Sequence, residues 1–174
     1  MTHYTLNTLP SNKNTFILDA NILIYLHGID PSPKYSRKYS KIAESLISRN
    51  CQILLDSVVL GEFINKYINS ALQKRLGIPA VRFNKKEHRN TPVYNTILKE
   101  LSALLKQIEK TYKIDWVIDE YDFIKNLTLV NFVNQFNKTE FNDFVLTRLA
   151  KSKNAIIVTN DNDFKSISDI DILN

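Results

Sequence analysis

Short apolar runs alternate with longer amphipathic stretches along this chain. Five of the runs are four to six residues long, rich in β-branched or aromatic side chains, and bounded by polar residues, a pattern typical of buried strands. These predicted strands are Thr15–Asp19, Gln52–Asp56, Asp115–Ile118, Asn154–Thr159 and Ile170–Leu173.

The stretches between the runs carry helical patterns. Lys34–Arg49 has apolar residues at helical spacing, Val58–Leu76 follows the good N-cap residue Ser57, and Thr91-Pro92 opens a helix that continues to about Tyr112. A less regular helix is expected over Tyr121–Phe136, and Thr139 could cap another from Glu140 to about Ser152. Strands that alternate with helices predict βαβ units and therefore an α/β fold with a mainly parallel sheet of about five strands.

The length of 174 residues suits one domain with a substantial core. We expect residues 1–13 to be a flexible polar lead-in and residues 14–174 to form a single domain. There is one cysteine, Cys51, which excludes an intrachain disulfide framework and fits a reducing cytoplasm. No apolar stretch approaches the roughly 20 residues that span a bilayer, so no membrane association is expected.

Acidic residues cluster near the ends of the predicted strands. Ligands of an open parallel sheet bind beyond the carboxyl ends of its strands. Asp19 ends the first strand, Glu62 lies in the helix after the second, and Asp161 and Asp163 follow the fourth. Asp143 lies at the start of the helix before that fourth strand. Four distant segments therefore deliver carboxylates to one sheet edge.

Each acid alone also has a structural explanation. Asp19 could be a helix N-cap, Asp143 a first-turn acid favoured by the helix dipole, and Asp161 a turn former. Their convergence favours a cation site, since two unit charges about 4 Å apart repel by about 4 kcal/mol at an effective dielectric of 20. Oxygen ligands of this kind suit Mg²⁺ or Mn²⁺.

Four segments resemble the motifs of PIN-domain nucleases. FILDANILIYL resembles the first motif, DSVVLGEFIN the second, and FNDFVLTRLAKSKNAIIVTNDNDF the joined third and fourth. The 18-residue step from Asp143 to Asp161 is the usual spacing in that family. The resemblance implies a three-layer sandwich with helices on both faces of the sheet. Relative to compact members, this chain carries a helical and basic insertion around residues 76–136.

The resemblance implies that Asp19, Glu62, Asp143 and Asp161 line one catalytic metal pocket. Asn21 and Thr159 would orient the carboxylates or a metal-bound water. Asp163 is either a further outer acid or a turn residue. The implied reaction is hydrolysis of an RNA phosphodiester assisted by Mg²⁺ or Mn²⁺. No nucleophilic side chain is required.

A basic segment, Lys74–Arg89, contains six Lys or Arg residues against one Glu. It is either a solvated loop or a surface for a phosphate backbone or an acidic partner. The candidate cations for RNA are Lys74, Arg75, Arg82, Lys85, Lys86 and Arg89, together with Arg148 and Lys151 on the predicted helix of Asp143.

Small PIN domains resemble the VapC-type ribonuclease toxins of toxin–antitoxin pairs. That resemblance implies a small antitoxin partner and a homodimer. Two alternatives are a non-catalytic PIN-fold module that binds RNA or protein, and a DNA-directed flap-type nuclease. The presence of all four acids argues against the first, and the lack of a recognisable helical arch argues against the second.

Overall fold

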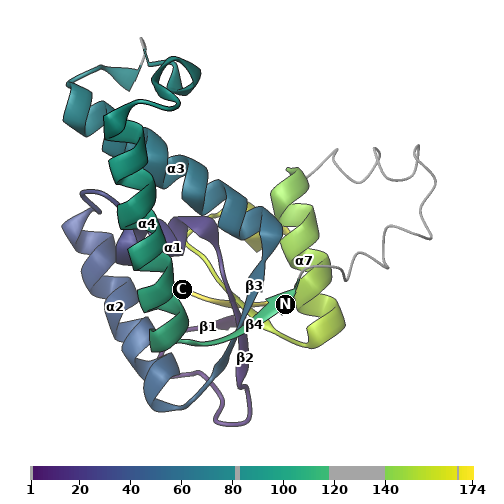
Figure 1. Cartoon of the computed structure of the whole chain (residues 1–174). Helices are drawn as coiled ribbons and strands as arrows, with labels where there is room; N and C mark the ends of the chain where they lie inside the picture. The colour runs from purple at the N-terminus through teal and green to yellow at the C-terminus, as the bar shows by residue number, and fades with distance from the viewer. Residues whose placement is uncertain (1, 81–82, 118–139, 168) are drawn as a thin grey trace.

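The computed structural model describes residues 2–80, 83–117, 140–167 and 169–174. The predicted helix over Tyr121–Phe136, the proposed cap Thr139 and the candidate Arg82 lie outside these residues. Within the described residues, five α-helices and six strands form an α/β fold. Figure 1 shows helices α2 and α4 on one side of the sheet and α7 on the other. The predicted layered architecture is therefore confirmed.

The sheet contains six strands, and every neighbouring pair is parallel. Their order is β1-β6-β5-β2-β3-β4. Their bounds are β1 Thr2–Tyr4, β2 Thr15–Leu18, β3 Gln52–Asp56, β4 Lys113–Val117, β5 Ile156–Val158 and β6 Asp171–Leu173. The five predicted strands correspond to β2 to β6.

The sixth strand lies in the segment expected to be a flexible lead-in. Thr2–Tyr4 pairs with β6 at the edge of the sheet, and the backbone N–H of Asn174 donates to the carbonyl of Tyr4 at 3.2 Å. Thr2 and His3 are exposed, so this edge strand has no apolar run to reveal it. The expectation of a loose segment throughout residues 1–13 was wrong for these three residues.

The five described α-helices connect or cover the strands. They are α1 Ala20–His27, α2 Pro33–Ser48, α3 Ser57–Leu76, α4 Pro92–Thr111 and α7 Phe141–Lys153. Two short 3₁₀ helices, η2 Lys85–His88 and η4 Asp163–Ser166, follow α3 and β5. The four helices predicted within the described residues are present, and α1 is a further short helix that begins directly after Asp19.

Capping residues fix where the helices begin and end. Thr91 accepts from the backbone N–H of Tyr94 at 3.2 Å and precedes a proline at the start of α4, as predicted. The N-cap of α3 is Asp56 instead of Ser57, because the Asp56 carboxylate accepts from the Val58 N–H at 2.7 Å. Gly77 ends α3 at a φ of 65°, a left-handed conformation that glycine adopts without steric cost.

The central strands β2 and β5 form the middle of the core. Phe16, Ile17, Ile156, Ile157 and Val158 are fully buried, because helices cover both faces of this part of the sheet. Such strands have no polar face, which explains their continuous apolar runs. The first polar side chains after them therefore emerge at the carboxyl edge of the sheet.

The strand order reverses between β2 and β5. From β2 the chain adds β3 and then β4 on one side, and it returns to place β5 and then β6 on the other. Crevices at such reversals are the usual ligand sites of open α/β sheets. The topology thus selects the carboxyl ends of β2 and β5 as the place to look for a site.

Candidate metal-binding and catalytic site

Asp19 and Thr159 meet at this reversal point. Leu18 and Val158 are paired in register, so the next residues on the two strands lie side by side. The Thr159 hydroxyl donates to Oδ2 of Asp19 at 2.8 Å, and Oδ1 of Asp19 accepts from the Asn21 N–H at 3.4 Å. Asp19 is therefore both the N-cap of α1 and a buried acid held by a neighbouring strand.

The loop after β5 continues the same network. The backbone N–H of Asp161 donates to the Thr159 hydroxyl at 3.0 Å, and the N–H of Asp163 donates to Oδ1 of Asp161 at 2.9 Å. The polar run after the buried strand thus forms a turn, and that turn also presents its carboxylates to the cavity described next. Asp161 thus accepts a hydrogen bond within a turn and also lines the cavity.

A cavity of about 190 Å³ brings the predicted acids together. Its lining includes all five acids singled out from the sequence, and it adds Glu140 at the N-cap of α7. One lysine, Lys66, also lines it. The acidic cavity is lined by Asp19, Asn21, Val58, Val59, Glu62, Lys66, Glu140, Asn142, Asp143, Leu146, Asp161 and Asp163.

The concentration of negative charge changes the acidity of two of these groups. Burial, together with the nearby charges of Asp161 and Asp19, raises the pKa of Asp143 to about 7. Burial also raises the pKa of Asp19, although the hydrogen bond from Thr159 opposes that change. Raised carboxyl pKa values mean that the ionised cluster is electrostatically unfavourable without a compensating cation.

Lys66 supplies part of that compensation. Its ammonium lies 2.5 Å from Oε1 of Glu62 and donates to Oδ1 of Asn21 at 2.8 Å. Glu62 and Lys66 are four residues apart on α3, a spacing that places side chains together on a helix. Sequence analysis missed Lys66, although the i, i+4 spacing from Glu62 could have revealed it. The Asn21 side chain therefore contacts the ammonium of Lys66 instead of contacting a carboxylate.

Asn142 and Glu140 are further site residues that sequence analysis did not single out. The Asn142 side-chain amide donates to Oε2 of Glu62 at 2.9 Å and so ties α7 to α3. The two residues are 80 positions apart in the chain. No local pattern predicts such a contact, because it depends on how α3 and α7 pack.

The donor chemistry of the acidic cavity fits a hard divalent cation. Its carboxylates supply oxygen atoms, which are the preferred ligands of Mg²⁺ and Mn²⁺. In the described part of the chain, however, no three His, Cys, Asp or Glu side chains are gathered closely enough to hold a metal ion. Glu62 is turned toward Lys66 and Asn142. The site therefore has oxygen donors that suit such a cation, and Lys66 is the cationic side chain among them.

The candidate cations of the basic segment have mixed surroundings. Lys74 lies 2.6 Å from Asp30, and Arg75 lies 2.5 Å from Glu100, so both are ion-paired. Lys85 donates to Oδ1 of Asn65, which is next to Lys66 on α3. Lys86, Arg89 and Lys151 are exposed, and the Arg148 guanidinium lies 5.4 Å from the Phe144 ring centre.

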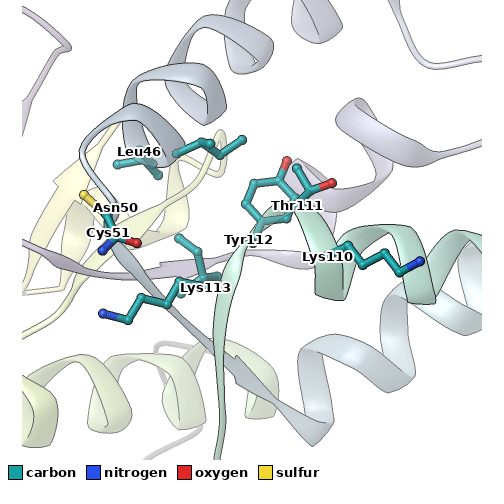
Figure 2. Close-up of a pocket in the computed structure, with 9 residues that line it drawn as sticks. Leu46, Asn50, Cys51, Lys110, Thr111, Tyr112 and Lys113 are labelled. Atoms are coloured by element: carbon teal, nitrogen blue, oxygen red, sulfur yellow. The ribbon is translucent and has the colours of Figure 1, made fainter.

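A second cavity, of about 310 Å³, lies at the opposite edge of the sheet. Its lining includes Cys51 and Lys113, which precede or begin strands β3 and β4. Figure 2 shows Lys110 and Lys113 extending in opposite directions from Tyr112. These two cations do not converge on a common position, and no carboxylate lines the cavity. It is not a candidate for the chemistry of the acidic cavity.

The carboxylate-lined cavity lies at the strand-order reversal, where open parallel sheets bind their ligands. The sequence profile described as "PIN domain" matches residues 16–170, so this chain belongs to the PIN domain family. No curated protein matches the chain closely enough to be reported as a relative.

Solved structures that share the fold include a toxin–antitoxin complex. It is described as the crystal structure of VapBC2 from Rickettsia felis bound to a DNA fragment from their promoter. The TM-score is 0.53 at 19% sequence identity, and the match covers 91% of this chain and 96% of the other. At that identity the likeness establishes the common fold alone.

None of the described helices combines the length and the apolar character that crossing a bilayer demands.

Proposed function

We propose that this chain is a ribonuclease that uses Mg²⁺ or Mn²⁺ to hydrolyse RNA phosphodiester bonds. The observation that carries the proposal is the convergence of Asp19, Glu62, Asp143 and Asp161 on one cavity at the strand-order reversal. Membership of the PIN family, whose members are generally nucleases, supports the same conclusion.

Asp19, Asp143 and Asp161 are the carboxylates we propose to hold the cation. When bound, the cation would supply positive charge for the scissile phosphate and would acidify a water molecule. Thr159 keeps one oxygen of Asp19 in a fixed position, and the same hydroxyl fixes the backbone at Asp161. Glu62 becomes available as a ligand when Lys66 releases it. Asp163 is exposed at the rim and is proposed as an outer acid.

RNA also needs cationic contacts outside the acidic cavity. Among the candidates from the sequence, Lys85 has the most favourable place, because its ammonium donates to Asn65, the residue before Lys66 on α3. Lys86, Arg89 and Arg148 remain proposed contacts. Lys74 and Arg75 are weaker candidates, since they lie about 18 Å or more beyond Glu62 along α3 at 1.5 Å per residue.

We further propose that the protein is the toxin of a type II toxin–antitoxin pair. In that role it would act in the cytoplasm, be inhibited by a small antitoxin and form a homodimer. The fold shared with a structure described as VapBC2 supports this assignment. Co-expression with the product of an adjacent small reading frame should suppress nuclease activity if the assignment is right.

The direct test of the reaction is cleavage of a labelled RNA by the purified protein. We expect cleavage with Mg²⁺ or Mn²⁺, none with EDTA, and recovery when excess metal is restored. A single-stranded DNA of the same sequence serves as the matched substrate, and cleavage of that DNA in preference to RNA would favour a DNA-directed nuclease. Metal-independent cleavage would contradict the proposed chemistry.

A further inference from the structure

The N-terminal half of α2 carries a concentrated set of cations outside the acidic cavity. Lys34, Arg37, Lys38 and Lys41 recur at helical spacing and are all exposed. Residues at such spacing share one face of a helix. No acidic residue occurs between positions 33 and 43. We call this surface the α2 basic face.

Helix stability does not account for the position of these cations. The N-terminal end of a helix is electropositive, so a cation in its first turn, here Lys34, is disfavoured by some tenths of a kcal/mol to about 1 kcal/mol. The first turn of α2 contains no acid, and Ser32 makes no side-chain capping hydrogen bond. A bound anion would remove this unfavourable charge arrangement.

The cations of the α2 basic face are also not neutralised from elsewhere. Among the residues that the structure describes, no carboxylate forms an ion pair with Lys34, Arg37 or Lys41. The Lys38 ammonium donates to the Asn174 side chain. Burial lowers the pKa of Lys38, and the nearby charges of Lys34 and Lys165 lower it further. Lys165, on η4, therefore adds to the same positive region.

A groove of about 440 Å³ runs beside this face. Its other wall is formed by residues that directly follow β1 and by Asn174 after β6. Its apolar contribution comes from Leu6 and Ile42, and no acidic side chain lines it. The groove therefore offers cations along one side and apolar surface beneath, and a positively charged groove is the feature with which proteins follow a phosphate backbone.

The groove lies on the same edge of the sheet as the acidic cavity. Asn174 follows β6, and β6 is two strands away from β2 in the sheet, or about 10 Å at the usual strand spacing. Tyr39 of α2 connects the two regions, since its hydroxyl donates to Oδ1 of Asn160 at 3.0 Å in the loop that carries Asp161. One extended strand of nucleic acid could thus occupy both.

We propose that this groove binds the phosphate backbone of the RNA strand on one side of the cleavage position. The inference rests on the proposed function for the identity of the polymer. It assigns to the α2 basic face a role in substrate binding that is separate from that of the Lys74–Arg89 segment.

The test measures RNA binding directly, without relying on cleavage. A fluorescein-labelled single-stranded RNA is titrated with Asp19→Asn protein, which does not consume the RNA, at several salt concentrations. The test variant adds Lys34→Ala, Arg37→Ala and Lys41→Ala. The matched control adds Lys99→Ala, Lys106→Ala and Lys110→Ala on α4, which removes the same charge from another helix.

We expect the test variant to bind RNA at least about tenfold more weakly at low salt than the control. Its log–log salt dependence should flatten by roughly 2, because each lost phosphate contact removes about 0.7 for single strands. Its thermal stability should be unchanged or slightly higher, because the removed side chains are exposed and Lys34 opposes the helix dipole. If the test variant bound RNA more weakly because it was partly unfolded, its thermal stability would also be lower. In that case RNA binding would be measured for the single variant Arg37→Ala.

Equal binding by the test and control variants would overturn the inference. So would a test variant that keeps RNA binding and loses binding to labelled polyglutamate, since the groove would then serve an acidic protein segment. The proposed function is tested separately. Wild-type protein that binds RNA through the groove but does not cleave it with Mg²⁺ or Mn²⁺ would support RNA binding by the groove and would exclude the nuclease activity.

Discussion

Thr159 donates its hydroxyl hydrogen to Oδ2 of Asp19 at 2.8 Å, across the boundary where the strand order of the sheet reverses. Thr159 is fully buried, and its hydroxyl oxygen also accepts the backbone N–H of Asp161. One hydroxyl thus fixes two of the proposed metal ligands, from β2 and from the loop after β5.

Replacing Thr159 with valine should therefore disturb the site without changing the size of the side chain. We expect metal affinity to fall about 10- to 100-fold, as is typical when a group that orients a ligand is lost. Stability should fall by about 1–3 kcal/mol, because the Asp161 N–H loses its acceptor. Thr159→Ser, which keeps the hydroxyl, should restore most of the Mn²⁺ affinity measured by calorimetry. Equal affinity for the valine and wild-type proteins would contradict this role.

Lys66 and a bound cation should compete for Glu62. In Lys66→Met the ammonium is lost, and the roughly 1 kcal/mol of repulsion that it exerts on an incoming metal disappears. Mn²⁺ affinity should rise about fivefold, while the metal-free protein should unfold at a lower temperature. Lys99→Met, on the exposed surface of α4, is the control for loss of one charge. Weaker Mn²⁺ binding by Lys66→Met would show that Lys66 assists the metal site instead of competing with it.

Asp143 should make the metal-free protein less stable as pH rises. Its pKa is about 7 in the folded chain against 3.8 ordinarily, so the folded state holds a proton that the unfolded state releases. This contribution is fully present below about pH 4 and is lost as pH rises to about 7. Asp143→Asn should therefore stabilise the protein at pH 8 by about 1 kcal/mol after allowance for solvent screening, and hardly at all at pH 4.

The measurement is thermal unfolding in EDTA at both pH values, with Glu44→Gln on α2 as the control for loss of an exposed acid. A gain of about 1 kcal/mol corresponds to roughly 2–4 °C for a domain of this size. Added Mn²⁺ should reverse the order, since the wild-type carboxylate is a proposed ligand. A gain at pH 4 that equals the gain at pH 8 would mean that the effect is not caused by ionisation of Asp143.

The alternation of apolar runs and helical patterns predicted the parallel α/β sheet, and the resemblance to PIN domains implied its layers. Buried parallel strands have no polar face, so their continuous apolar runs located β2 to β6, and the polar residues after them located Asp19 and Asp161. Strand β1 was missed because it is a short edge strand whose first two residues are exposed. The position of β1 is set by its pairing with β6 and not by a strand preference of its own residues.

The parts of the site that were missed depend on tertiary packing. Asn142 reaches Glu62 because α7 packs near α3, and the α2 basic face becomes a groove only when the ends of β1 and β6 lie beside it. The placement of Lys85 over Asn65 likewise depends on how the segment after α3 folds back. Sequence spacing predicts contacts within one helix, such as Glu62 with Lys66, and does not predict contacts between distant elements.

Asp56 provides an unusually close control for Asp19. Each aspartate is buried, lies at the carboxyl end of a strand and caps the next helix by accepting a backbone N–H two residues later. Asp19 lines the acidic cavity, whereas Asp56 does not. Asparagine is also a good N-cap residue, so Asp→Asn at either position should preserve the helix.

The central claim is that carboxylates at the strand-order reversal hold the cation that drives RNA cleavage. The most direct measurement compares single-turnover RNA cleavage in Mn²⁺ by wild type, Asp19→Asn and Asp56→Asn. The account predicts that Asp19→Asn loses at least about 100-fold in rate while Asp56→Asn remains within a few-fold of wild type, with both variants folded. Equal rates for the two variants, or an active Asp19→Asn protein, would contradict the account.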